Sequence, residues 1–269
     1  NIKTVDIYAF VNNNITKFIV RNSNTTLYNY GNGNHILTRN QTNPSNLTII
    51  AHAGSTAESL ANSEGFTFVR GNEEVTFSSN GNSTWAKSHS TRINVDGYDP
   101  NKSLQYAWST STSTPSSGWS TLTNGASITR SSGTGNYYLH VRGTNNFGEA
   151  FNVRSNAFRV DNTLPSISIS KNGGDWARNH FTTLSVSDSH SGIDKIEYRW
   201  TTSSSFPSSG FTSVSNRTEL NTPTSTGNHY LHIKTTDNAG NVRQFTSNVF
   251  RVDRTAPTLN LSPSTTNYT

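Results

Sequence analysis

The sequence predicts an all-β protein built from tandem two-layer sandwiches, and three observations lead to this prediction. Short segments alternate apolar and polar side chains, which is the pattern of strands that bury one face. Turns rich in Gly, Asn and Ser separate these segments. The whole pattern returns after 92 residues, and self-similarity at a domain-sized interval indicates tandem modules.

The repeat is clearest in one long stretch. Residues 227–241 read Gly-Asn-His-Tyr-Leu-His-Ile-Lys-Thr-Thr-Asp-Asn-Ala-Gly-Asn. Residues 135–148, which begin 92 positions earlier, read Gly-Asn-Tyr-Tyr-Leu-His-Val-Arg-Gly-Thr-Asn-Asn-Phe-Gly. The same offset relates the Tyr-x-Trp sequence at 198–200 to that at 106–108. Each copy is therefore expected to form the same strands in the same order.

These copies set the predicted domain boundaries. Two complete units are expected at 70–161 and 162–253, each long enough to bury its own core. Residues 1–69 are expected to form a divergent copy that lacks its first strands, and residues 254–269 the opening strand of a further unit. About seven short strands per unit, with a tryptophan on the third, predict immunoglobulin-like β-sandwich domains arranged end to end.

Composition excludes several kinds of site and partner. The chain has no cysteine and no methionine, so it can form neither a disulfide nor a thiolate metal site. Its formal net charge of +5 comes from scattered residues, without the basic stripe that nucleic-acid binding needs. No apolar run approaches the length of a membrane span, and no signal peptide opens the sequence.

No catalytic motif stands out in the sequence. There is no nucleophile elbow, no His-Glu-x-x-His helix and no phosphate-binding glycine loop. His140 and His232 occupy equivalent positions in two units, which indicates a repeated structural role rather than one active site. The chain is therefore expected to have no enzymatic activity and no cofactor, apart from the calcium considered below.

Four motifs link the chain to a known family. They are the Val-Asp-x-Thr-x-Pro linkers at 160–165 and 252–257, the Asp-Ser-His-Ser-Gly-Ile turn at 188–193, the Tyr-x-Trp strand at 198–200, and the stretch at 230–241. In these motifs the chain resembles the tandem bacterial Ig-like domain repeats of large surface and secreted proteins. The resemblance implies a stalk, adhesive or surface-layer role without catalysis, at the bacterial cell surface or in a secreted protein.

The extent of this resemblance differs along the chain. It is good over 162–257, fair over 70–161 and faint before residue 69. The unit at 70–161 departs from the pattern where Asn-Asn-Phe-Gly-Glu at 145–149 replaces Asp-Asn-Ala-Gly-Asn at 237–241. A role of Asp237 therefore does not transfer to the unit at 70–161.

Five aspartates near the predicted junctions are candidate calcium ligands. They are Asp161 and Asp253 in the linkers, and Asp188, Asp194 and Asp237 in turns. Calcium binds about six to eight hard oxygen atoms, which a linker and an adjoining loop could supply. In some similar Ig-like repeats such sites stiffen the junction. The alternative is that these side chains accept hydrogen bonds within their own turns, as Asp and Asn commonly do.

Four aromatic residues are candidates for binding glycans. Trp119 and Phe211 each follow Pro-Ser-Ser-Gly, and Trp85 and Trp176 lie in the first inter-strand loops. Exposed rings of this kind could stack on the sugar faces of a host or cell-wall glycan. Their recurrence at matched positions instead favours packing against the sandwich.

The sequence therefore predicts a non-catalytic structural or adhesive arm of a bacterial extracellular surface protein, with neighbouring Ig-like domains as its partners. Two alternatives are left open. One is a glycan-binding module. The other is a self-assembling filament or surface-layer subunit, in which residues 254–269 of one copy add as a strand to the incomplete first domain of the next.

Overall fold

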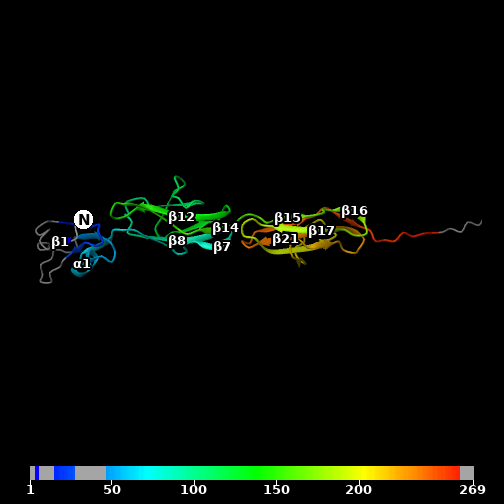
Figure 1. Cartoon of the computed structure of the whole chain (residues 1–269), viewed down its shortest axis with the longest axis horizontal. Helices are drawn as coiled ribbons and strands as arrows, with labels where there is room; N and C mark the ends of the chain where they lie inside the picture. The colour runs from blue at the N-terminus through cyan, green and yellow to red at the C-terminus, as the bar shows by residue number, and fades with distance from the viewer. Residues whose placement is uncertain (1–3, 6–14, 28–46, 261–269) are drawn as a thin grey trace, which may run out of the picture. The chain divides into compact units, whose positions relative to one another are not determined.

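The computed structural model describes residues 4–5, 15–27 and 47–260 (Figure 1). Contacts divide the chain into two compact units. The first consists of Asn1–Thr84, Ser88–Ser131 and Gly135–Val160, and the second of Trp85–Lys87, Ser132–Thr134 and Asp161–Thr269.

The first unit contains a two-sheet sandwich. One sheet has the strand order β11–β8–β6, formed by Ser127–Arg130, His89–Asp96 and Glu74–Phe77. The other has the order β10–β9–β12–β14–β7, formed by Ser120–Thr121, Gln105–Ser109, Gly135–Thr144, Phe158–Val160 and Asn82–Ala86. A further strand, β13 (Ala150–Arg154), pairs antiparallel with β12.

The core of this sandwich lies between its two sheets. Ile93 and Val95 of β8 face Leu139 and Val141 of β12, and all four side chains are almost completely buried. Because successive residues of a strand point to opposite faces, the period-two pattern places these side chains in one layer. The predicted core tryptophan, Trp108, is partly buried and packs against the same cluster.

The second unit repeats this architecture strand by strand. Its smaller sheet has the order β15–β17–β20, formed by Ser166–Ile169, Phe181–Ser187 and Glu219–Asn221. Its larger sheet has the order β16–β23–β21–β18–β19, formed by Gly174–Ala177, Phe250–Val252, Gly227–Asp237, Ile193–Thr201 and Thr212–Ser213. The strand β22 (Val242–Thr246) pairs with β21. This strand order confirms the predicted fold class, because both units hold Ig-like β-sandwiches.

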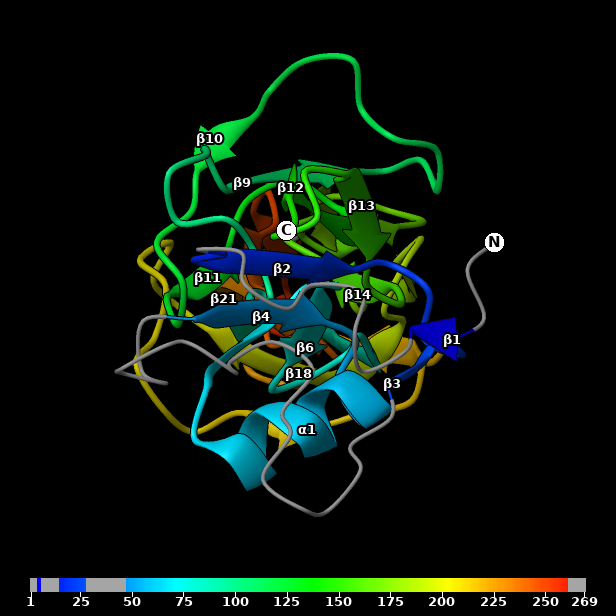
Figure 2. The ribbon, with the colours of Figure 1, turned by 90° about the vertical axis from the view of Figure 1, so that its left-hand side faces the viewer.

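The start of the chain has a different arrangement. Strands β2 (Lys17–Val20), β4 (Thr48–Ala51) and β5 (Thr67–Arg70) pair in parallel, in the order β2–β4–β5. Strands β1 (Thr4–Val5) and β3 (Thr26–Leu27) form a second parallel pair. Figure 2 shows β2 and β4 side by side, with the helix α1 beside them.

Helix α1 (Thr56–Glu64) connects β4 to β5, as parallel neighbours require. Its N-terminus is capped by Ser55, whose side chain accepts a hydrogen bond from the backbone N–H of Glu58 at 3.3 Å. Gly65 ends the helix in the left-handed conformation, with φ of 71°. No helix in the described part of the chain is long and apolar enough to cross a membrane.

This arrangement corrects the prediction that residues 1–69 form a divergent Ig-like copy. The described residues of that segment form parallel strands and a helix, whereas Ig-like sandwiches pair neighbouring strands mainly in antiparallel fashion. The sequence pattern identified the strand segments near 17–20, 47–53 and 65–69 but not their partners. Short apolar runs do not reveal strand direction, which depends on residues far away in the chain.

The predicted opening strand at 254–269 is only partly within the described residues. Residues 254–260 are exposed and form no strand. Residues 261–269 lie outside the described part, as do residues 1–3, 6–14 and 28–46 of the segment to which they were expected to add. The strand-exchange hypothesis therefore stays a prediction.

Candidate functional site

Three of the five predicted calcium ligands come together in the second unit. One carboxylate oxygen each from Asp161, Asp188 and Asp237 lies within 4.8 Å of the other two. Asp161 and Asp237 are completely buried, with exposed fractions of 0% and 1%, and Asp188 is partly buried. Asp194 and Asp253 are exposed and lie outside this group.

Each of the three aspartates also stabilises its own turn. One carboxylate oxygen accepts the backbone N–H two residues further on, at 2.9 Å for Asp161, 3.0 Å for Asp188 and 2.9 Å for Asp237. Asp253 forms the same bond, at 2.9 Å, to the N–H of Thr255. These side chains therefore have the expected turn-forming role. The turn bonds use Oδ1 of Asp161, Asp188 and Asp237, and the Oδ2 atom of each takes no part in them.

Asp161 holds the other two turns together. Its Oδ2 accepts a hydrogen bond from the backbone N–H of Ser191 at 3.1 Å. Its backbone carbonyl accepts one from Asn241 Nδ2 at 3.0 Å, and the same Nδ2 donates to Asp237 Oδ2 at 2.8 Å. Asn241 was not among the predicted site residues, although its place at the end of the Asp-Asn-Ala-Gly-Asn turn at 237–241 is a usable signal.

Lysine and arginine do not balance the charges of this cluster within the described residues. In the described part of the chain no lysine or arginine forms a salt bridge with Asp161, Asp188 or Asp237. Two like charges about 5 Å apart repel each other by roughly 3 kcal/mol at an effective dielectric constant of about 20. Asp188 Oδ2 is buried and has no hydrogen-bond partner among the described residues.

The protonation state of Asp161 adds to this imbalance. Burial acts to raise the pKa of its carboxyl group, but hydrogen bonds from Ser191 and Thr163, together with the charge of His190, lower that pKa below its usual value. Asp161 is therefore an anion at neutral pH.

A calcium ion fits this donor set. Carboxylate oxygens are the hard ligands that Ca²⁺ prefers, and Asp188 Oδ2 is a buried acceptor with no donor among the described residues. Asp161, Asp188 and Asp237 would hold the ion, which would supply the positive charge that the cluster lacks.

The equivalent turn of the first unit shows that a carboxylate at position 237 is not needed for the turn itself. Asn145, 92 residues before Asp237, accepts the backbone N–H groups of Phe147 at 3.1 Å and Glu149 at 2.9 Å through Oδ1. Asp237 Oδ1 accepts the corresponding two N–H groups, the second of them at 2.7 Å. A neutral amide thus supports the same turn, so Asp237→Asn can test the charge without removing the turn.

The four candidate aromatic residues have different surroundings. Trp85 lies against His190, with ring centroids 5.8 Å apart, and Phe211 stacks on Phe206 at 5.4 Å. The guanidinium of Arg142 lies 4.0 Å from the ring of Trp119.

Trp176 is the exception, because 59% of its surface is exposed. The expectation that the matched rings pack against the sandwich is therefore wrong for this residue. Trp176 and Trp85 each precede an alanine at the end of an edge strand. No local sequence pattern therefore indicates that their exposure differs. Glycan binding by any of the four stays a prediction.

His140 and His232 are both buried beneath the loop that follows the Tyr-x-Trp strand, which agrees with a repeated structural role. His232 Nε2 donates to the carbonyl of Ser203 at 3.1 Å, and its Nδ1 accepts from the hydroxyl of Thr246 at 2.9 Å. Burial lowers the pKa of His232, the bond to Ser203 raises it, and the charge of Arg199 lowers it further. The net result is a pKa below the usual 6.5.

We expect the second unit to lose stability in mild acid for this reason. The unfolded chain binds a proton at His232 at a higher pH than the folded chain does. The stabilising contribution of the neutral ring is therefore complete above about pH 6.5 and is lost as the pH falls through the lowered folded pKa. Urea unfolding of the wild type and of His232→Gln over this range measures the effect, and the variant should show the weaker pH dependence. Equal dependence in both proteins would contradict the prediction.

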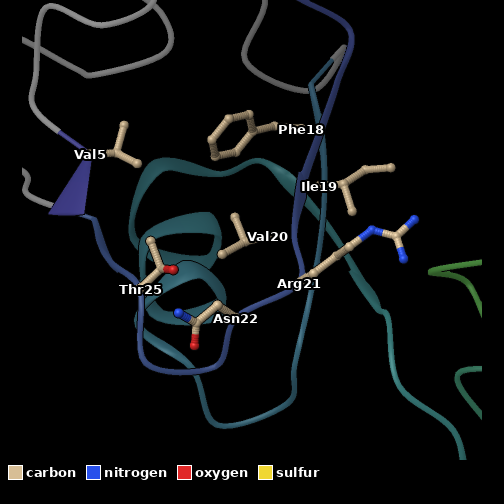
Figure 3. Close-up of a pocket in the computed structure, with 7 residues that line it drawn as sticks. All are labelled: Val5, Phe18, Ile19, Val20, Arg21, Asn22 and Thr25. Carbon is tan, nitrogen blue, oxygen red and sulfur yellow. The ribbon is translucent and has the colours of Figure 1, made fainter. Parts of the chain in front are cut away.

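A separate pocket lies in the N-terminal segment (Figure 3). Its volume is about 240 Å³, and it is lined mainly by apolar side chains from β1 and β2, including Val5, Phe18 and Val20. Arg21 is the one charged residue among those that Figure 3 labels, and it forms a salt bridge with Glu149 at 2.9 Å. These lining residues offer no convergent set of catalytic groups.

No protein-family model and no curated protein sequence matches the chain. Solved structures similar to it include the fibronectin(III)-like modules of Clostridium thermocellum CbhA, at 12% identity and a TM-score of 0.29, covering 70% of this chain and 100% of that one. The three N-terminal domains of the bacteriophage RB49 highly immunogenic outer capsid protein match at 12% identity and a TM-score of 0.31. This match covers 67% of this chain and 59% of that one. Bacteroides ovatus SGBP-B, in complex with a mixed-linkage heptasaccharide, matches at 13% identity and a TM-score of 0.23. This match covers 68% of this chain and 48% of that one. At these TM-scores the likeness supports no closer relationship, and the assignment of the fold rests on strand order and register.

Proposed function

We propose that the chain is a non-catalytic structural segment of a bacterial extracellular protein, either surface-attached or secreted. In this proposal a calcium ion at Asp161, Asp188 and Asp237 holds the linker at the start of the second unit against two of that unit's turns. The observation that supports it is the convergence of three carboxylates, two of them fully buried, without a lysine or arginine partner among the described residues.

The proposed role of the ion follows from where its ligands lie in the chain. Asp161 belongs to the segment that leads into the second unit, Asp188 follows β17, and Asp237 ends β21. An ion shared by the three would join the linker to both turns more strongly than the hydrogen bonds of Ser191 and Asn241 do alone. The linker would then be stiff in calcium and looser without it.

The proposal predicts that calcium stabilises the second unit. Binding at about 100 times the dissociation constant adds roughly 2.7 kcal/mol to the free energy of unfolding. For a domain of this size that corresponds to a rise in melting temperature on the order of 10 °C. Differential scanning calorimetry of the full chain, with calcium and then with excess EDTA, measures the rise and its reversal.

Two variants make this experiment specific. Asp237→Asn should keep its turn, as Asn145 does, and lose most of the response to calcium. Asp194→Asn removes an exposed carboxylate outside the cluster and should respond like the wild type. The proposal fails if calcium does not raise the melting temperature of the wild type, or if Asp237→Asn responds as strongly as the wild type does.

A further inference from the structure

The outer face of the larger sheet in the first unit carries a polar pocket. It has a volume of about 210 Å³ and lies where β9, β12 and β13 run side by side. The polar side chains that line it are those of Ser103, Gln105, Arg142 and Thr144. This pocket belongs entirely to the first unit and is separate from the aspartate cluster.

Arg142 is held in the pocket without a carboxylate partner. Its Nε donates a hydrogen bond to Gln105 Oε1 at 2.9 Å, and its guanidinium lies 4.0 Å from the ring of Trp119. The indole N–H of Trp119 is itself bound to the carbonyl of Pro115 at 3.0 Å, so the ring is fixed as well. The two terminal nitrogens of Arg142 form no hydrogen bond or salt bridge with any described residue.

The second unit contains the same arrangement with a carboxylate and a second lysine added, since Lys195 replaces Ser103. At positions 92 residues later, Glu197 replaces Gln105, Lys234 replaces Arg142 and Phe211 replaces Trp119. Lys234 Nζ lies 4.8 Å from the ring of Phe211 and 3.1 Å from Glu197 Oε2. Glu197 also pairs with Lys195 at 2.7 Å. The cation that lies on the aromatic ring therefore has a carboxylate partner in the second unit, shared with Lys195, and has none among the described residues of the first.

We infer that the pocket of the first unit binds the carboxylate of an acidic sugar, such as a uronate. The carboxylate of the ligand would take the place that Glu197 occupies in the second unit, where it would accept two parallel hydrogen bonds from the free end of Arg142. The hydroxyl groups of Ser103 and Thr144 and the side-chain amide of Gln105 are suited to the hydroxyl groups of the sugar. Because the pocket is polar and only as large as one sugar ring, it favours a sugar over an extended acidic peptide.

This inference goes beyond the structural role proposed above and does not depend on it. Binding can be followed in the full chain by nuclear magnetic resonance, through the indole N–H signal of Trp119, which is assigned by its loss in Trp119→Phe. Sodium glucuronate should shift this signal to saturation, and glucose at the same ionic strength should not.

The second unit supplies the matched variant. Gln105→Glu introduces the carboxylate that Glu197 provides 92 residues later, where Arg142 can pair with it as Lys234 pairs with Glu197. It should weaken glucuronate binding at least about tenfold, as should Arg142→Gln, because a hydrogen-bonded charge pair contributes about 1.5–3 kcal/mol. Thr76→Ala, on the other sheet, should bind as the wild type does.

Several results would overturn the inference. They are the absence of a saturable shift with glucuronate, equal shifts with glucose and glucuronate, unchanged affinity in Gln105→Glu, and binding of a poly-glutamate peptide in preference to glucuronate.

Discussion

Replacing Phe250 with alanine is expected to lower the free energy of unfolding of the second unit by about 3–5 kcal/mol. The ring is completely buried. It packs edge-on against Trp200, with centroids 5.2 Å apart, and lies 5.6 Å from the ring of His180. Truncation would remove this apolar surface and leave a cavity that the strands on either side cannot fill without moving.

Urea unfolding of the full chain tests this prediction. Phe158 is the counterpart of Phe250 in the first unit, is also completely buried, and lies 5.4 Å from the ring of Trp108. Phe158→Ala should therefore produce a similar loss, confined to the transition of the first unit. Gln244→Ala, on an exposed position of β22, serves as the control and should change stability by less than about 0.5 kcal/mol. A loss below about 1 kcal/mol in Phe250→Ala would contradict the packing described for this ring.

Replacing Gly97 with alanine is expected to destabilise the first unit by more than about 3 kcal/mol. Gly97 has φ of +72°, a conformation that residues with a side chain adopt at a cost. A Cβ atom at this position would also lie 2.0 Å from the backbone carbonyl oxygen of Asn72. Because the obstructing atom belongs to the backbone, the substitution would have to displace the chain just before β6.

A second glycine separates the clash from the strain. Gly118 has a similar φ of +79°, and a Cβ atom there would meet nothing within 4 Å. Gly118→Ala should therefore cost only about 1–2 kcal/mol, the usual penalty of a left-handed conformation. Thermal unfolding of both variants gives the difference, which measures the clash. Equal losses in the two would show that Asn72 does not constrain Gly97.

The repeat made the sandwiches predictable in detail. A difference of 92 residues relates Trp108 to Trp200 and Phe158 to Phe250, and both pairs take the same positions in the two cores. The helix at 56–64 was missed although its capping residues, Ser55 with Glu58 and Gly65, are visible in the sequence. Its buried face consists only of Ala57, Leu60 and Ala61, so the hydrophobic period of the helix is weak in the sequence.

The candidate site was predictable only as a set of residue types. Five aspartates were expected near the junctions, and the fold brings together Asp161, Asp188 and Asp237 while leaving Asp194 and Asp253 exposed. Asp161 and Asp253 occupy the same linker motif, so no local feature separates the buried one from the exposed one. The unpaired state of Arg142 is equally hidden, because it depends on which residue faces it from the neighbouring strand.

Periodicity and repetition were thus sufficient to establish that this chain contains two β-sandwiches of one design, because alternation along a strand is a local property that burial of one face imposes. Only the tertiary structure established that the strands at the start of the chain are parallel, that three carboxylates come together and that Trp176 is exposed. Each of these depends on which distant segments become neighbours. The spacing of residues along the chain does not specify such contacts, since they are selected by the packing of the whole unit.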